Sequence, residues 1–498
     1  MFPSRLLIAL TTALAATVAG APAWARQVSP APVPAPVVTV LEPAAIRADF
    51  TALYEGLQQA TYDLYAHTPK PVLDRLYDET LNGFDQSVSL DEIRTRFQLF
   101  VAEARLGHAR IEVPAAEYAA FRAAGGKAFP LMLRIVAGRS YVGTDYSGLG
   151  TVDLGDEILS LDGVPMADWL ERTGRHLSTD NDYMAHSLLE FMFPQLIWLE
   201  RGEVERFELV VRKADGREQA LTLPARSRPE ALAAAGAQPE TLELDGSSRS
   251  ADMLDHGVAY LRPGPSYNVE PGANPWDPAA FHTFIDAAFA RFMADSATDL
   301  LIDLRVNPGG DNSFSDHMVA WFADRPFRFA SDFRIRISPQ SIASNAERVA
   351  AEPVGTEGAS SQLAALYADV EPGGIVHFAF PESAPRDGPR FEGRVWVLVN
   401  RQTYSNAVST AALIQDYGFG TILGEPTSDL ATSYGAMEHF TLPATGLRVG
   451  YPKAHIIRPS GDEEARGVTP DILIETPVIQ SAADPVLQQA LAILRSRP

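Results

Sequence analysis

Apolar spacing divides the chain into segments with different secondary structure. From residue 43 to about 105, apolar side chains recur at helical intervals, as in Phe50, Leu53 and Leu57, so this stretch is predicted to be helical. The last of these helices is predicted to run from about Asp91 to Gly107, followed by a short strand over 109–113. These patterns predict a helical N-terminal unit.

Residues 116–240 show the alternation of apolar and polar residues that is typical of strands. The run over 131–148 predicts one β-hairpin, and the run over 206–223 predicts a second around Asp215-Gly216. Between them, a strand and an Asp-Gly turn lead into a helix over 167–177. We expect a small β-rich module here.

The third unit, about 250–475, alternates strands with helices. Residues 299–305 and 394–400 are near-continuous apolar runs, typical of buried parallel strands. Each ends in a polar loop that leads into a predicted helix, and open βα sheets bind ligands at the loops after their strands. The other predicted elements are a strand over 257–263, helices over 281–293, 313–322, 406–417 and 483–496, and an insertion over 340–375.

The first residues predict export. Arg5 precedes an apolar run that ends in Ala23-Trp24-Ala25, the layout of a signal peptide cut after residue 25. The alternative is a retained anchor, but the run is short and rich in Ala and Thr. We therefore expect a soluble periplasmic or secreted protein. The expected segments are a signal peptide (1–25), a Pro-rich linker (26–42), a helical domain (43–115), the β-rich module (116–240), a core (241–480) and a C-terminal helix (481–498).

Composition excludes several kinds of chemistry. The chain has 498 residues, no Cys and a formal net charge of −22. Disulfides and thiolate catalysis are therefore excluded, and nucleic acid or an anionic membrane is an unfavourable partner. No HExxH run occurs, so we expect neither a metal nor a cofactor.

Two strand ends carry unusual loops. After the first strand, Gly309-Gly310 can turn backbone N–H groups toward a bound oxygen, although a plain turn is the alternative. After the second, Ser405 stands where a helix begins, and the Asn406 N–H could donate to an oxyanion. Ser is also a preferred helix N-cap, and the GxSxG elbow of another hydrolase class is absent.

Four motifs occur in a fixed order along the third unit. They are IDLRVNPGGDN (302–312), VWVLVNRQTYSNAVSTAALIQDYG (395–418), ILGEPTSDLATSYG (422–435) and RPSGDEEARGVTPDI (458–472). Together they resemble the tail-specific (C-terminal processing) and tricorn-type serine peptidases, and the resemblance extends to LGHARI (106–111) in the helical unit. LGDEILSLDGVPM (154–166) resembles their PDZ-type module. The resemblance implies a multidomain α/β protein with a crotonase/Clp-protease-like ββα spiral core, acting on peptides or unfolded proteins.

The resemblance also distinguishes two kinds of general base. One branch pairs Ser with a Lys about 25 residues later, but here the first downstream lysine is Lys453, about twice as far. The tricorn-type branch uses His and Glu, which implies His108 as base and Glu464 as its support, with Glu463 as the neighbouring alternative. Ser405 would be the nucleophile. An imidazole can take the proton of a serine hydroxyl, and a carboxylate can orient the imidazole directly or through a relay that stays open.

Further features of the site follow from the same comparison. The oxyanion hole would use the N–H groups of Asn406 and of Gly309 or Gly310. His317 is a weaker base candidate, whose ring we expect to pack on its helix or face water. The chain departs from the family pattern at Ala109, where Thr is frequent, and at Asn406, where a small or acidic residue is common.

Other functions stay open at this point. A catalytically silent relative would bind an apolar ligand or peptide C-termini, since the family includes a retinoid carrier. A metalloenzyme has little support, and a PDZ-only scaffold leaves the third unit unexplained. PDZ-type modules bind C-terminal carboxylates as an added strand, so recognition of peptide tails is possible. The oligomeric state is not predicted.

Overall fold

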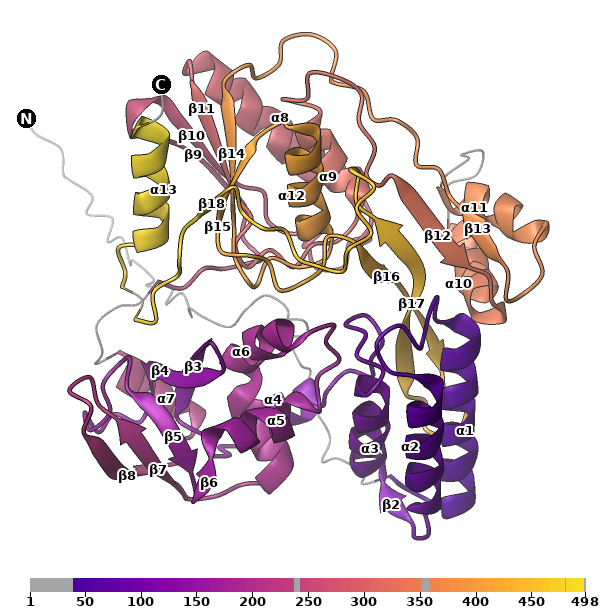
Figure 1. Ribbon diagram of the computed structural model, residues 1–498, viewed down its shortest axis with the longest axis vertical. Coiled ribbons are helices and arrows are strands. Elements are labelled where there is room, and N and C mark those ends of the chain that lie inside the picture. The colour runs from indigo at the N-terminus through magenta and orange to yellow at the C-terminus, as the bar shows by residue number, and fades with distance from the viewer. Residues whose placement is uncertain (1–38, 237–241, 352–358, 480, 497–498) are drawn as a thin grey trace, which may run out of the picture.

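The two apolar runs of the third unit lie side by side in the middle of one sheet (Figure 1). The computed structural model describes residues 39–236, 242–351, 359–479 and 481–496. The expected signal peptide and most of the linker lie outside the described residues. The last linker residues form β1 (Val40–Leu41), which pairs with β2 (Val88–Ser89).

The central sheet of the third unit has six strands in the order β18-β15-β14-β11-β10-β9. All neighbours are parallel except β9 and β10. Apolar side chains project from both faces, which agrees with the continuous apolar runs in the sequence. The strands are β9 (Ser250–Leu254), β10 (Val258–Arg262), β11 (Asp299–Asp303), β14 (Arg394–Val399), β15 (Thr421–Gly424) and β18 (Ile472–Leu473).

Helices cover both faces of this sheet. One face packs against α8 (Ala279–Ala294), α9 (Asn312–Val319) and α12 (Asn406–Tyr417), and the other against α13 (Pro485–Ser496). The predicted helix over 406–417 is confirmed, with Gly418 in the left-handed conformation directly after it. These helices bury the strands from which the two candidate loops emerge.

A second sheet joins the third unit to the helical unit. It is antiparallel, in the order β13-β12-β17-β16, and contains β12 (Asp332–Arg336), β13 (Ile375–His377), β16 (Ser433–Thr441) and β17 (Arg448–Ile457). The far end of the β16–β17 hairpin reaches the helical unit, where Leu447, Val449 and Tyr451 are buried (Figure 1). That unit consists of α1 (Pro43–Ala60), α2 (Lys70–Asn82) and α3 (Leu90–Ala102). The predicted insertion includes α10 (Pro339–Ala351) and α11 (Ala359–Ala368).

The second unit is an antiparallel sheet in the order β3-β4-β5-β7-β8, with β6 paired to β5. Both predicted hairpins are confirmed, as β3–β4 and β7–β8. Its strands are β3 (Leu131–Val136), β4 (Arg139–Asp145), β5 (Glu157–Leu161), β6 (Val164–Pro165), β7 (Arg206–Arg212) and β8 (Glu218–Pro224). Its helices are α4 (Ala115–Ala123), α5 (Met166–Gly174), α6 (Asp182–Arg201) and α7 (Arg228–Ala235).

Two predicted elements need correction, and one long helix was not expected. The helix expected to end at Gly107 ends at Ala102, because Arg105 adopts a positive φ of 55° that no α-helix continues through. The strand expected over 109–113 is absent, and Arg110 makes a single bridge to Gly450 instead. The helix α6 has 20 residues and was not expected. Asn181 caps it, its side chain accepting the Met184 N–H at 2.8 Å, and Pro194 lies inside it.

One property of the helices bears on membrane insertion. Across the described ranges, none of them is both long enough and apolar enough to cross a bilayer.

Candidate active site

Ser405 occupies a strained turn between β14 and α12. Its backbone has φ 53° and ψ −126°, a region that residues with a side chain rarely adopt. Its hydroxyl makes no capping hydrogen bond to α12, although the residue stands at the N-cap position. The helix-cap interpretation of Ser405 is therefore wrong, and the side chain, which is only partly buried, is free for another role.

Neighbouring loops hold this turn in place. The Ser405 N–H donates to Asp429 Oδ2, and the Tyr404 N–H donates to the Asn307 carbonyl at 2.9 Å. Asn406 is buried, and its Nδ2 donates to Ser315 Oγ at 3.0 Å on α9. The Asn found in place of the family's small or acidic residue thus ties the start of α12 to the helix after the glycine loop.

Gly309 and Gly310 pack directly against this turn. Their φ angles are 80° and 140°, and a Cβ on Gly309 would lie 2.6 Å from the Asn406 nitrogen. The Gly309 N–H is already engaged, since it donates to Asn307 Oδ1 at 2.9 Å. In the described part of the chain, no hydrogen bond engages the N–H of Gly310 or of Asn406. Of the two alternatives, Gly310 is therefore the glycine whose N–H is available to an oxyanion beside Asn406.

His108 lies on the loop after α3, next to the same turn. It is 7% exposed, and its ring stacks on Tyr404 with 5.5 Å between the centroids. Arg110 links the two segments, because its Nη1 donates to the Gly107 carbonyl at 3.3 Å and the Tyr404 hydroxyl at 3.4 Å. The fold thus brings a histidine from the helical unit to a serine about 300 residues away, although no hydrogen bond joins their side chains.

The environment of His108 favours its neutral form. Burial, followed by the charge of Arg110, lowers the pKa of His108 to about 4, while the Tyr434 backbone acts in the opposite direction. Its buried Nδ1 has no hydrogen-bond partner among the residues that the structure describes. Of these influences, only the Tyr434 backbone favours the protonated ring, so burial and the charge of Arg110 prevail.

Comparison with known proteins identifies the third unit. A model of peptidase family S41 matches residues 279–474, which include the Gly309-Gly310 loop and Ser405. The matched part of the chain belongs to peptidase family S41. It is therefore a serine-type peptidase. No curated protein sequence matches the chain significantly.

Solved structures extend the similarity beyond the matched residues. Mature CPAF complexed with lactacystin aligns with a TM-score of 0.59 and 17% identity over 91% of this chain and 98% of that one. The photosystem II D1 C-terminal processing protease aligns with a TM-score of 0.42 and 15% identity, over 87% and 95%. The tricorn protease aligns with a TM-score of 0.40 and 11% identity, over 91% and 37%. The likeness to CPAF shows a shared fold over nearly all of this chain.

Within the described residues, no hydrogen bond or ion pair joins Glu464 or Glu463 to His108. The Glu464 side chain is 66% exposed, with Oε2 3.4 Å from Arg466 Nε, and Glu463 is exposed and pairs with Arg334 at 2.9 Å. The role of Glu464 stays a prediction.

The other basic candidates have partners of their own. Lys453 is buried and pairs with Glu438 at 2.6 Å. His317 pairs with Asp286 at 2.6 Å and stacks on His282, so its ring packs on the neighbouring helix α8 and not on its own helix α9. These contacts explain the positions of Lys453 and His317 without assigning either side chain a role in the reaction.

Two buried carboxylates beside the site were not predicted. Asp429 is 1% exposed and accepts the N–H groups of Ser405 and Leu430, and burial raises its pKa to about 6. Asp180 is 9% exposed, and a Cβ on Gly107 would lie 2.5 Å from its Oδ2. Burial and then the charge of Asp429 raise the pKa of Asp180 to about 7. Asp429 lies within the motif over 422–435, but no role was assigned to it there, and Asp180 belongs to no motif, so only the fold shows that both lie beside the site.

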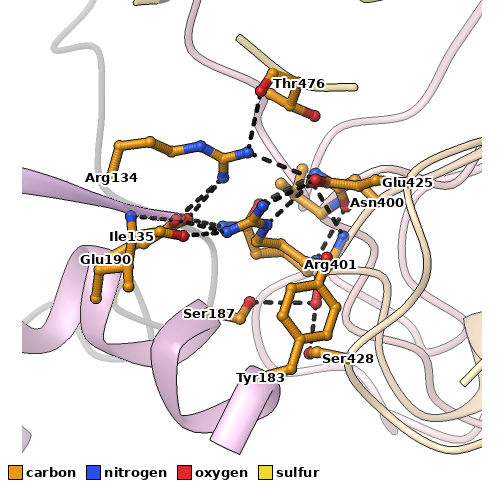
Figure 2. A network of polar contacts seen from close by, with 12 residues as sticks. Arg134, Ile135, Tyr183, Ser187, Glu190, Asn400, Arg401, Glu425, Ser428 and Thr476 are labelled. Carbon is orange, nitrogen blue, oxygen red and sulfur yellow. Dashed lines mark hydrogen bonds and ion pairs between the residues drawn. The ribbon is translucent and has the colours of Figure 1, made fainter. Parts of the chain in front are cut away.

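A buried ion network fixes the second unit to the segment before Ser405 (Figure 2). Arg401, four residues before Ser405, pairs at 3.0 Å with Glu190 of α6 and at 3.0 Å with Glu425. Arg134 of β3 pairs with Glu190 at 3.0 Å and lies 3.5 Å from Glu425. The Arg401 carbonyl also accepts the hydroxyl of Ser428, next to Asp429, at 2.6 Å. The second unit thus holds both loops that meet at Ser405.

Proposed function

We propose that Ser405 is the nucleophile of this peptidase and His108 its general base. One observation carries the assignment: the Ser405 hydroxyl does not cap α12, and it stands on a strained turn beside the N–H groups of Asn406 and Gly310, which have no hydrogen-bond partner among the described residues. A strained strand-to-helix turn is the way other hydrolases expose a nucleophilic serine. Ala109 and Asn406 remove no group that this chemistry needs.

The reaction follows from these positions. Ser405 Oγ attacks the peptide carbonyl carbon while His108 takes the hydroxyl proton. The N–H groups of Asn406 and Gly310 hold the resulting oxyanion, and His108 gives its proton to the leaving amine. Water then hydrolyses the acyl-enzyme, again with His108 as base. A helix N-terminus behind Asn406 adds a favourable field for the oxyanion.

The second unit is proposed as a PDZ-like module that presents substrate tails. Its support is an antiparallel sheet with helices α5 and α6, joined to the Ser405 turn by the buried ion network. A tail added as a strand would bind through backbone hydrogen bonds. We also propose export after removal of residues 1–25, on the pattern of the N-terminal sequence. Binding of matched peptides with free and amidated C-termini tests the first point.

A peptide-library assay tests the catalytic assignment. Wild type, Ser405→Ala and Ser409→Ala are compared; Ser409 lies one turn further along α12 and serves as the matched control. We expect wild type and Ser409→Ala to cleave peptides, and the cleavage rate of Ser405→Ala to be lower by roughly 10³-fold or more. Equal cleavage by wild type and Ser405→Ala would refute the assignment. Cleavage by none of them, together with binding of an apolar ligand, would favour the silent carrier.

A further inference from the structure

Asp180 is a buried acid that no side chain of the described residues pairs with. It precedes α6, whose cap Asn181 donates from Nδ2 to the Ser428 carbonyl at 3.0 Å. Neither carboxylate oxygen of Asp180 makes a hydrogen bond of good geometry within the described chain. The N–H groups of Gly107 and Asp180 nevertheless lie close enough to lower its pKa partly. A buried unpaired carboxylate is unfavourable, so its retention beside the site calls for a reason.

The carboxylate lies against the residue that precedes the proposed base. A Cβ on Gly107 would meet Asp180 Oδ2 at 2.5 Å, so glycine at this position makes room for the acid. Gln98 of α3 holds the two segments together: its Nε2 donates to the His176 carbonyl at 3.0 Å, and its Oε1 accepts the Ile111 N–H at 2.7 Å. His108 Nδ1 is buried and unpaired in the same region.

The charged and titratable groups around Asp180 come from several elements. Asp429, on the loop after β15, contributes to the raised pKa of Asp180. The charge of Asp180 in turn contributes, after burial, to the raised pKa values of Tyr404 on the Ser405 turn and Tyr434 on β16. Arg110, the neighbouring cation, is held by Glu112 and the Tyr404 hydroxyl. The titratable groups that interact with Asp180 are therefore Asp429, Tyr404 and Tyr434, while His108 and Arg110 follow Gly107, against which the carboxylate packs.

We propose that Asp180 is a positioning residue for His108, accepting a hydrogen bond from the ring when the ring holds the proton of Ser405. This inference rests on the proposed function. In the free enzyme the two groups are not bonded, and catalytic hydrogen bonds often tighten only in the substrate complex. A buried carboxylate that pairs with the imidazolium fixes the ring and stabilises the cation.

Two other carboxylates are less suited to this role. Both oxygens of Asp429 already accept backbone N–H groups, from Ser405 and Leu430. Glu464 is exposed to solvent and pairs with Arg466, and exposed ion pairs contribute about 0–1 kcal/mol.

The experiment compares kcat and KM across pH for wild type, Asp180→Asn, Asp180→Glu, Glu464→Gln and Asp182→Asn. Asp182 is the matched control, an exposed acid two residues away that pairs with Arg105. We expect Asp180→Asn to lower kcat roughly 10²-fold or more with KM within about threefold, and Asp180→Glu to recover part of it. The carboxylate must be ionised to act. In wild type, kcat should therefore rise with pH through the pKa of Asp180, and this acid limb of the pH profile should be displaced in Asp180→Asn.

The outcomes separate this inference from the proposed function. The role of Asp180 alone would be overturned if Asp180→Asn kept the wild-type kcat and an unchanged acid limb of the pH profile while Ser405→Ala was inactive. Full activity in Ser405→Ala would overturn both. If Asp180→Asn does not fold, the ¹⁵N shifts of His108 in wild type carrying a fluorophosphonate adduct on Ser405 decide instead. A doubly protonated ring that titrates together with a carboxylate supports the role, and a neutral ring at pH 6 contradicts it.

Discussion

Arg401 and Glu190 form an ion pair of 3.0 Å that joins the segment before Ser405 to α6 of the second unit (Figure 2). Both side chains are 7% exposed. Buried pairs hold geometry strongly, because removing one partner leaves the other charge uncompensated. The position of the Ser405 turn therefore depends on a unit that contributes no reacting group.

Glu190→Gln should destabilise the protein by about 3–5 kcal/mol, the range for breaking a buried ion pair. The free energy of unfolding by urea measures this directly. Glu208→Gln is the matched control, since Glu208 forms an exposed pair with Arg206 at 3.2 Å and its loss should change stability by less than about 1 kcal/mol. Equal effects of both substitutions would show that the buried network does not hold the second unit in place.

Gly309→Ala should lower kcat by roughly 10²–10³-fold, the size of effect seen when one oxyanion donor is lost. The new Cβ would lie 2.6 Å from the Asn406 nitrogen and displace the turn. Gly216→Ala separates this clash from backbone strain, because Gly216 has a similar φ of 84° with open space around it. That control should lose about 1 kcal/mol of stability and keep its activity. Unchanged kcat in Gly309→Ala would contradict the proposed oxyanion hole.

Stability should depend on pH through Asp180. Its folded-state pKa is raised to about 7 from 3.8, so the folded protein binds the proton more tightly than the unfolded chain does. The stabilisation from this proton is complete below pH 4 and is lost as pH rises to 7. The stability of wild type relative to Asp180→Asn should therefore fall between pH 4 and 7, at a slope of up to about 1.4 kcal/mol per pH unit.

Urea unfolding at pH 5 and pH 8 checks this dependence, with Asp182→Asn as the exposed control. His108 and Asp429 also titrate in this window, but they are present in all three proteins. A stability difference between wild type and Asp180→Asn that is the same at both pH values would contradict the raised pKa of Asp180.

Local signals made part of this site predictable. Ser405 and Gly418 could be located because a strand end, a helix start and a left-handed cap each have a short sequence pattern. Gly309 and Gly310 stood out because two adjacent glycines after a buried strand permit backbone angles that other residues resist. His108 was found through the resemblance, since nothing in its local sequence distinguishes it from a structural histidine.

The rest depended on distant contacts. Asp180 and Asp429 are 249 residues apart in the chain, and their shared burial arises only when α6 docks on the loop after β15. The helix α6 has a clear cap at Asn181, but Pro194 interrupts the pattern that normally marks a long helix. The proposal for Asp180 could not be reached from sequence, because it rests on the burial of that carboxylate, and burial is a property of the fold.

The most direct test of the central assignment is the site of reaction with a fluorophosphonate, mapped by peptide mass spectrometry. We predict a single adduct on Ser405 in folded wild type. The adduct should be absent in Ser405→Ala and retained in Ser409→Ala, and it should form much more slowly in His108→Asn. An adduct on another residue, or labelling of wild type at a rate that His108→Asn leaves unchanged, would contradict it.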